Sequence, residues 1–212
     1  MIPKEAFDPI IAELKRRPLE YNAYRDQAGE GRSQAFGLVN RRCLAPDYSR
    51  QNWKRPYLYH LLIDFADKYV DVSYNAMTLN QNYRANKHYD KHNSGNSFLV
   101  AFGSYTGGEL LIHEGDLSGS HNIWCKPIRA DFSKILHSVE HFVGDRFSLV
   151  YYNLVSNRMP EHIPPPSVRL EDGQYYFYRG EEKITNGLPH PLRGRDRKEI
   201  LETAQKKKQQ KV

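Results

Sequence analysis

Apolar residues recur at two different spacings along the chain, and the two spacings predict different elements. Positions 7, 10, 11 and 14 are apolar, which is a helical repeat, so we expect a helix over residues 4–17 that Pro18 ends. Residues 57–69 have a strong apolar face and predict a second helix. The intervening residues 18–56 are rich in Arg, Gln, Gly and Asn, and we expect loops with short elements there.

From residue 72 the apolar residues fall in short runs separated by turn residues, a pattern typical of strands. Strands are predicted near residues 74–83, 85–91, 97–102, 108–113, 122–128 and 146–153. Gly107-Gly108 and Gly144-Asp145 are predicted turns. Four prolines between Pro160 and Pro166 end this block, because proline fits neither a helix interior nor a central strand. Beyond them, residues 174–178 predict an edge strand or an aromatic lid, and residues 195–209 predict a terminal helix.

Two helices followed by a run of strands indicate a mainly β protein with flanking helices, of the α+β class. We expect the helices to pack on one face of a double-sheet β-barrel of the jelly-roll or cupin kind. The length of 212 residues fits a single domain overall. Within it we expect an N-terminal helical support region over residues 1–71, a β core over residues 72–160, and a C-terminal extension with a basic tail over residues 161–212.

Composition argues against several classes of protein. No apolar run reaches the roughly 20 residues that cross a bilayer, so we expect no membrane span. The N-terminal apolar stretch contains acidic residues, which argues against a signal peptide. Cys43 and Cys125 are too few for a disulfide framework or a cysteine-based zinc site. We therefore expect an intracellular protein, cytoplasmic or nuclear and not secreted, with both thiols reduced.

The net charge of +6 is concentrated at one end of the chain. Residues 191–212 carry eight basic and three acidic residues, whereas the other 190 residues carry 23 basic and 22 acidic ones. A basic tail fits attraction to nucleic acid, and a solvated, frayed end is the alternative interpretation. Residues 1–190 are nearly neutral, which argues mildly against an extensive contact surface for double-stranded nucleic acid.

The candidate chemistry lies between residues 80 and 153. His88 and Asp90 form an H-x-D triplet in a predicted strand, where side chains two positions apart share a face and can bind one metal ion. A second histidine would complete the two-histidine, one-carboxylate set typical of non-heme Fe(II) oxygenases. His137 is the best candidate for this second histidine, with His141 as a rival. The alternative interpretation is that His88 and Asp90 form a hydrogen-bonded pair on the surface and that His137 is a buried structural histidine. Three other histidines are interpreted as surface or loop residues: His92, His113 and His121.

A basic residue with a neighbouring hydroxyl follows the candidate histidine. Arg146 lies nine residues after His137, and Arg146 and Ser148 share one face of the predicted strand over 146–153. A guanidinium offers a planar fork for a carboxylate, and the hydroxyl adds a further hydrogen bond. The pair is therefore a candidate clamp for the far carboxylate of a 2-oxo acid, with a surface ion pair as the alternative.

Together these motifs resemble the Fe(II)/2-oxoglutarate-dependent dioxygenase superfamily, and most closely its TET/JBP-like nucleic-acid pyrimidine hydroxylases. The resemblance implies a double-stranded β-helix catalytic core over residues 72–160. It implies Fe(II) held by His88, Asp90 and His137, and 2-oxoglutarate as cosubstrate held by Arg146 and Ser148. It also implies O2 as a reactant and ascorbate as a supporting reductant. The residues that carry it are His88–Lys91, Asn93, Gly95, Ser97, Phe98–Leu110, Asp131–Ser133, His137 and Gly144–Tyr152.

For a TET/JBP-like enzyme the implied target is the 5-methyl group of 5-methylcytosine or thymine in nucleic acid, reached by base flipping. Two asparagines, an aromatic platform and a nearby cation are the candidate substrate contacts. A protein hydroxylase of the prolyl or lysyl type, a small-molecule hydroxylase and a non-catalytic nucleic-acid-binding barrel are the alternatives. The candidate substrate residues are Asn80, Asn82, Tyr83, Lys91 and Tyr105, with Tyr89 as a further stacking candidate and Arg84 and Lys87 as further phosphate contacts.

Overall fold

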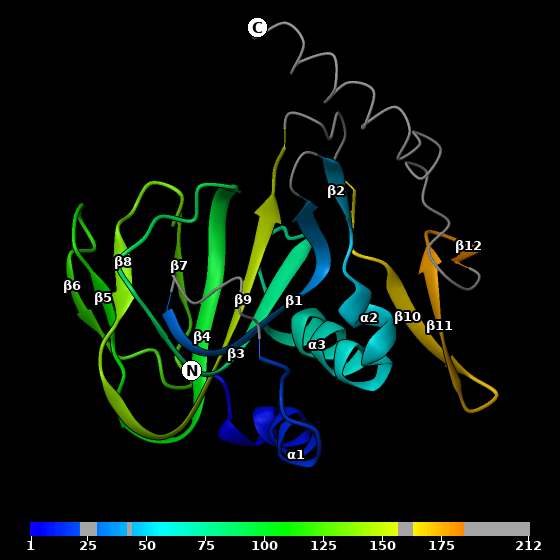
Figure 1. The fold of residues 1–212 in the computed structure, drawn as a ribbon, viewed down its shortest axis with the longest axis horizontal. Coiled ribbons are helices and arrows are strands. Elements are labelled where there is room, and N and C mark those ends of the chain that lie inside the picture. The colour runs from blue at the N-terminus through cyan, green and yellow to red at the C-terminus, as the bar shows by residue number, and fades with distance from the viewer. Residues whose placement is uncertain (22–28, 42–43, 157–162, 185–212) are drawn as a thin grey trace, which may run out of the picture.

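The computed structural model describes residues 1–21, 29–41, 44–156 and 163–184 (Figure 1). Its helices are the 3-10 helix η1 (Lys4–Phe7) and the α-helices α1 (Asp8–Arg16), α2 (Arg50–Lys54) and α3 (Pro56–Tyr69). The predicted helices over 4–17 and 57–69 are therefore confirmed. The strands are β1 (Gly29–Arg41), β2 (Leu44–Tyr48), β3 (Ala76–Ala85), β4 (Asn93–Gly107), β5 (Leu110–Ile112), β6 (Gly119–His121), β7 (Ile128–Ala130), β8 (His137–Val139), β9 (Phe142–Leu154), β10 (Ser167–Glu171), β11 (Gln174–Arg179) and β12 (Glu182–Ile184).

Two antiparallel sheets pack against each other and form the core of the molecule (Figure 1). The larger sheet has six strands in the order β2-β1-β3-β9-β4-β7, and the smaller has three in the order β6-β5-β8. Leu99 of β4 and Leu110 of β5 belong to one buried apolar cluster, which joins the two sheets. The expected mainly β class with a double-sheet core is therefore confirmed.

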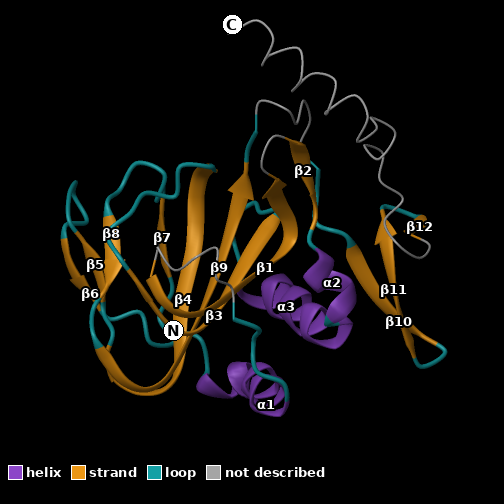
Figure 2. Cartoon of the chain, in the orientation of Figure 1, coloured by secondary structure: helices purple, strands orange, loops and turns teal. Residues whose placement is uncertain are grey.

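Helices cover the face of the larger sheet that points away from the smaller one (Figure 2). Phe7 at the end of η1 stacks on Phe102 of β4 with the ring centroids 4.4 Å apart, and it also contacts Phe65 of α3 at 5.1 Å. The buried hydroxyl of Tyr151 on β9 donates a hydrogen bond of 2.8 Å to the Leu62 carbonyl of α3. The aromatic residues of the sheet therefore fix where the helices lie.

Phe7 is predicted to be a major source of stability, because its side chain is fully buried between the sheet and α3. Replacing Phe7 with alanine leaves a cavity that the rigid sheet cannot close, and we expect the free energy of unfolding to fall by about 3–5 kcal/mol. Urea unfolding followed by far-UV circular dichroism measures this. A loss below about 1 kcal/mol would contradict the packing described, and Phe7→Leu is the control that keeps most of the volume.

Side chains alternate along each strand, so the two faces of the larger sheet differ in chemistry. On β9, Phe147, Leu149 and Tyr151 point into the helix-covered core. The residues between them point toward the smaller sheet and line a cavity of about 500 Å³. Arg146, Ser148, Val150, Tyr152 and Leu154 form this side of the cavity. The alternation thus separates a structural face from a face available for chemistry.

The expectation of loops over residues 18–56 is wrong for much of that range, because β1, β2 and α2 lie there. Ser33 and Gln34 are buried polar residues of the 13-residue strand β1. They interrupt the apolar repeat from which a strand would be predicted. Its neighbours β2 and β3 hold it by backbone pairing. Asn52 of α2 adds side-chain bonds to the N–H and carbonyl of Gly37. Long-range pairing, which short-range patterns do not report, therefore specifies this strand.

Two predicted strands are absent from the sheets. Residues 86–92 form no strand, although His88 makes an isolated bridge to His137. The strand expected over 122–128 is wrong as well: β6 ends before it, and β7 begins at Ile128. Cys125 has a φ of 52°, which interrupts an extended backbone. This stretch meets β4 through an isolated bridge between Ala101 and Trp124 and through the Trp124 indole N–H, which donates to the Gly103 carbonyl at 3.0 Å.

Gly144-Asp145 is part of β9 and not a turn, which corrects the prediction. Gly144 has a φ of 108°, and a Cβ there would lie 2.4 Å from the Ser104 carbonyl oxygen, so the glycine permits close approach of β4. Gly107-Gly108 does connect β4 to β5, as expected. Residues 174–178 belong to β11, the middle strand and not the edge of a separate sheet, β10-β11-β12. That sheet packs on the helices through Phe177, whose ring centroid lies 4.9 Å from that of Trp53.

The basic tail over 191–212, the helix expected over 195–209 and the first part of the proline block lie outside the described residues. Cys43 also lies outside them, whereas Cys125 is a buried free thiol. No helix in the described part of the chain has both the length and the apolar character that crossing a membrane requires.

Candidate metal centre

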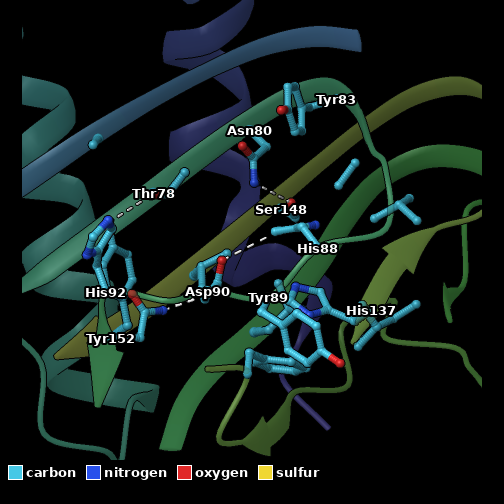
Figure 3. Close-up of a pocket in the computed structure, with 18 of the residues that line it drawn as sticks. Thr78, Asn80, Tyr83, His88, Tyr89, Asp90, His92, His137, Ser148 and Tyr152 are labelled. Atoms are coloured by element: carbon cyan, nitrogen blue, oxygen red, sulfur yellow. Dashed lines mark hydrogen bonds and ion pairs between the residues drawn. The ribbon is translucent and has the colours of Figure 1, made fainter. Parts of the chain in front are cut away.

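His88, Asp90 and His137 converge in the lining of the cavity (Figure 3). One potential ligand atom from each residue lies within 4.8 Å of the others. The Nε2 atom of His88 is 3.5 Å from Oδ1 of Asp90, and the two histidine rings have their centroids 4.3 Å apart. Two imidazoles and a carboxylate at this spacing match the ligand set of a facial iron site.

Backbone hydrogen bonds bring these three residues together although no regular strand carries His88 and Asp90. The N–H of His88 donates to the carbonyl of His137 at 3.0 Å, and the N–H of His137 donates back at 3.1 Å. The N–H of Asp90 donates to the Phe132 carbonyl at 2.9 Å. The segment after β3 therefore runs alongside the segment that enters β8. This pairing gives His88 and Asp90 the shared face that a regular strand was expected to provide.

Both histidines have their rings oriented by a backbone carbonyl. Nδ1 of His88 lies 2.7 Å from the Asn86 carbonyl oxygen, and Nδ1 of His137 lies 2.9 Å from that of Ile135. A carbonyl only accepts, so each Nδ1 carries the proton and each Nε2 presents a lone pair. This second layer of hydrogen bonds is the arrangement that metal-binding histidines use.

The charge state of the cluster also suits a cation. Burial lowers the pKa of His137, and its bond to the Ile135 carbonyl and the neighbouring His88 act in opposite directions on that pKa. The imidazole is therefore neutral at pH 7, as a metal ligand must be. Asp90 accepts a hydrogen bond of 3.2 Å from Asn93 through Oδ2. The rival His141 is exposed and is not among the residues of the cluster or of the cavity lining.

Arg146 lies at one end of the cavity as an almost fully buried cation, with 2% of its surface exposed. Its Nε donates to the Gly108 carbonyl at 3.1 Å, and its guanidinium lies 5.4 Å and 5.6 Å from the ring centroids of Tyr105 and Phe142. Nη2 is buried without a hydrogen-bond partner in the described structure. A buried charged donor is costly unless an acceptor reaches it, so the site fits a carboxylate ligand.

Ser148 lies next to Arg146 on the same face of β9 and continues the polar end of the cavity. Its Oγ accepts a hydrogen bond of 3.1 Å from Nδ2 of Asn80, its cross-strand partner on β3. The Ser148 hydroxyl is left to donate, and Oδ1 of Asn80 is buried without a partner in the described structure. Burial lowers the pKa of Arg146, whereas the nearby Tyr105 and Glu109 raise it. The guanidinium stays charged, and a dicarboxylate is the ligand that would complete this end.

Gly108 is predicted to be required for the position of Arg146. A Cβ at Gly108 would lie 2.9 Å from both Cδ and Nε of Arg146, and the φ of 76° adds backbone strain. We expect Gly108→Ala to displace the guanidinium and to raise the KM for 2-oxoglutarate about tenfold or more, equivalent to one lost charge-assisted hydrogen bond. Gly115→Ala is the matched control, because Gly115 has a φ of 78° but open space around it. Equal effects of the two substitutions would contradict this role.

The cavity includes some of the predicted substrate residues and not others. Tyr83 and Lys91 line it beside Asn80. Asn82 lies outside the lining and is exposed: its Oδ1 accepts the Arg146 backbone N–H at 2.8 Å, and its φ of 49° removes it from the strand face that was predicted. Tyr105 contacts Arg146 and is likewise outside the lining. The structure therefore brings Asn82 and Tyr105 to Arg146 and not to the open cavity.

Sequence reasoning missed several lining residues at the other end of the cavity. Thr78, Tyr152 and His92 lie there (Figure 3). The hydroxyls of Thr78 and Tyr152 are 3.3 Å apart. The two-residue alternation that paired Arg146 with Ser148 extends to Tyr152, so this signal was present in the sequence. His92, which was interpreted as a surface or loop residue, is exposed and also lines the cavity.

Comparison with known proteins identifies relatives by structure only. No protein-family model and no curated protein matches the sequence. NgTET1, solved in complex with 5mC DNA, matches with a TM-score of 0.51 and 14% identity over 72% of this chain and 69% of the other. An oxidoreductase of the 2OG-Fe(II) oxygenase family from Burkholderia pseudomallei matches at 0.47 (16% identity, 76% and 87%), and a Pseudomonas putida prolyl-4-hydroxylase at 0.45 (11% identity, 73% and 89%). The likeness to NgTET1 confirms, at the level of the fold, the resemblance drawn from the motifs.

Proposed function

We propose that this protein is an Fe(II)- and 2-oxoglutarate-dependent dioxygenase that hydroxylates the 5-methyl group of a pyrimidine in nucleic acid. One observation carries the oxygenase assignment: a His-Asp-His cluster, whose histidines both contact backbone carbonyls through Nδ1, shares a cavity with a buried arginine whose Nη2 has no partner among the described residues. Two histidines and one carboxylate leave adjacent coordination positions open on Fe(II). A 2-oxo acid that chelates the metal and extends a second carboxylate matches both features at once.

Residues in and around the cavity then have defined tasks. His88, Asp90 and His137 hold the iron, which, when bound, supplies the oxygen chemistry that decarboxylates 2-oxoglutarate and hydroxylates the substrate. Arg146 pairs with the far carboxylate of the cosubstrate, and Ser148 donates a hydrogen bond to it. Tyr105 and Phe142 keep the guanidinium in place. Leu99, Ile123 and Val150 give the cavity apolar walls that exclude water.

The choice of substrate is supported by the far end of the cavity. Tyr152 lies four residues beyond Ser148, a distance of about 13 Å along the strand, so the two ends can hold different molecules. Figure 3 shows Thr78, His92 and Tyr152 on one side of Asp90, and His88 and His137 on the other. This end offers hydroxyl and imidazole groups and a flat ring, which suit the edge and face of a nucleobase. A volume of about 500 Å³ lies within the range of ligand pockets.

Two further observations favour nucleic acid. NgTET1, whose fold this chain shares, was solved in complex with 5mC DNA. Exposed cations surround the H-x-D segment: Lys91 lines the cavity, and Arg84 and Lys87 precede it. Cations at the mouth of a cavity can hold phosphates on either side of a flipped nucleotide. The basic residues of the tail add to this attraction.

Nucleoside mass spectrometry tests the substrate assignment. We would incubate the protein with Fe(II), ascorbate, 2-oxoglutarate, oxygen and duplex DNA that contains thymine and 5-methylcytosine, and quantify succinate in the same sample. The proposal predicts a hydroxymethyl-pyrimidine that is absent with the His88→Ala variant. Succinate formation with peptide substrates but no modified base would contradict the nucleic-acid substrate and favour a protein hydroxylase.

A further inference from the structure

Glu114, in the turn that follows β5, contacts both segments that carry the candidate metal ligands. Its Oε1 accepts a hydrogen bond of 2.8 Å from the backbone N–H of Leu136, the residue directly before His137. Its carboxylate also interacts with the hydroxyl of Tyr89, the residue between His88 and Asp90, which raises the pKa of Tyr89 and lowers that of Glu114. One side chain therefore connects the two ligand segments from outside the cluster.

The surrounding hydrogen bonds hold Glu114 in register with the His137 segment. The backbone N–H of His113 donates to the Leu136 carbonyl at 2.9 Å, and Nε2 of His113 lies 2.9 Å from Oγ of Ser138. Leu136 is thus bonded through both its N–H and its carbonyl to the turn after β5. This turn is anchored to the smaller sheet by the pairing of β5 with β8.

The H-x-D segment needs such a connection more than the His137 segment does. His137 begins a strand, but His88 and Asp90 lie in irregular chain held by a few backbone bonds. Tyr89 is 37% exposed, and Figure 3 shows its ring close to the ligand cluster. An interaction between its hydroxyl and the Glu114 carboxylate limits the freedom of the residues on either side of Tyr89.

We propose that Glu114 is a positioning residue of the metal site, which fixes the distance between the H-x-D segment and His137 through Tyr89 and the Leu136 N–H. The inference rests on the proposed metal site and extends it to a residue that does not touch the metal. Partners outside the ligand set that orient the ligands typically contribute about 10–100-fold to metal affinity. A glutamine at this position keeps an oxygen that accepts from the Leu136 N–H and an amide NH2 that can donate to the Tyr89 hydroxyl oxygen, so it can replace the glutamate.

Titration with Co(II), followed by the visible absorption of the bound ion, tests the proposal without requiring turnover. We expect Glu114→Ala to weaken Co(II) affinity about tenfold, Glu114→Gln to keep near-normal affinity, and Tyr89→Phe to lower it by a smaller factor. Adding Tyr89→Phe to Glu114→Ala should cause little further loss, because both changes break the same connection. Asp116→Ala, an exposed acid of the same turn, is the matched control and should match the wild type.

Thermal unfolding without metal distinguishes positioning from a general role in folding. We expect the metal-free Tm of Glu114→Ala to stay close to that of the wild type while the affinity falls. Unchanged Co(II) affinity in Glu114→Ala would overturn the inference, as would an equal loss in the alanine and glutamine variants. If the wild type itself does not bind Co(II), the proposed metal site fails, and that result is distinct from a failure of the role of Glu114.

Discussion

His137→Ala is expected to abolish Fe(II)-dependent succinate formation. The rate should fall more than about 100-fold, which exceeds the effect of removing a residue that only hydrogen-bonds a metal ligand. His137 is 5% exposed and presents Nε2 to the cluster. Its removal leaves His88 and Asp90, and among the described residues the ligand cluster includes no further histidine. His88→Ala and Asp90→Ala should have the same consequence. The measurement is succinate release together with the iron content of the purified protein.

The control for this series is His141→Ala. His141 lies four residues after His137, is exposed, and is outside the cluster. We expect its replacement to leave both iron content and succinate release unchanged. Full activity of His137→Ala, or loss of iron in His141→Ala, would show that the third ligand had been assigned to the wrong residue.

Replacing Arg146 with methionine is expected to have opposite effects on cosubstrate binding and on stability. The guanidinium is buried, and its Nη2 has no partner in the described part of the chain. Breaking its pairing with a bound carboxylate should therefore cost about 3 kcal/mol or more, roughly 100-fold in the affinity for 2-oxoglutarate. Without the cosubstrate the same substitution removes a buried charge that is only partly compensated, so the Tm of the protein alone should rise or stay the same.

Isothermal titration with 2-oxoglutarate and thermal unfolding in its absence measure the two effects. Arg129→Met is the matched control, because Arg129 pairs with Asp71 at the surface and lies over Phe98, outside the cavity. We expect this control to leave cosubstrate affinity unchanged. An unaltered affinity in Arg146→Met would rule out Arg146 as the carboxylate clamp.

The sequence predicted the composition of the site better than its local structure. Spacing and residue type were enough to propose His88, Asp90 and His137, and the structure places their ligand atoms together. The strand assigned to residues 85–91 is absent beyond Ala85, because the shared face comes from hydrogen bonds to Phe132 and His137 far along the chain. Such pairing between distant segments leaves no short-range pattern to detect.

The same limit explains the residues and elements that were missed. β1 carries Ser33 and Gln34 in buried positions, so its apolar repeat is weak although two neighbouring strands hold it. Asn82 was expected on the face of Asn80, but its positive φ changes the register at that point. Tyr152 was predictable from the alternation along β9, whereas the bond between Glu114 and the Leu136 N–H required the three-dimensional structure.

The central claim is that one cavity holds Fe(II) through His88, Asp90 and His137 and 2-oxoglutarate through Arg146. An anaerobic titration of the Fe(II)-loaded protein with 2-oxoglutarate tests it most directly, because a 2-oxo acid chelated to Fe(II) produces a visible charge-transfer absorption whether or not a substrate is present. We predict that this absorption develops in the wild type, requires a much higher cosubstrate concentration in Arg146→Met, and is absent in His137→Ala. Absorption of equal strength and midpoint in all three proteins, or none in the wild type, would contradict the account.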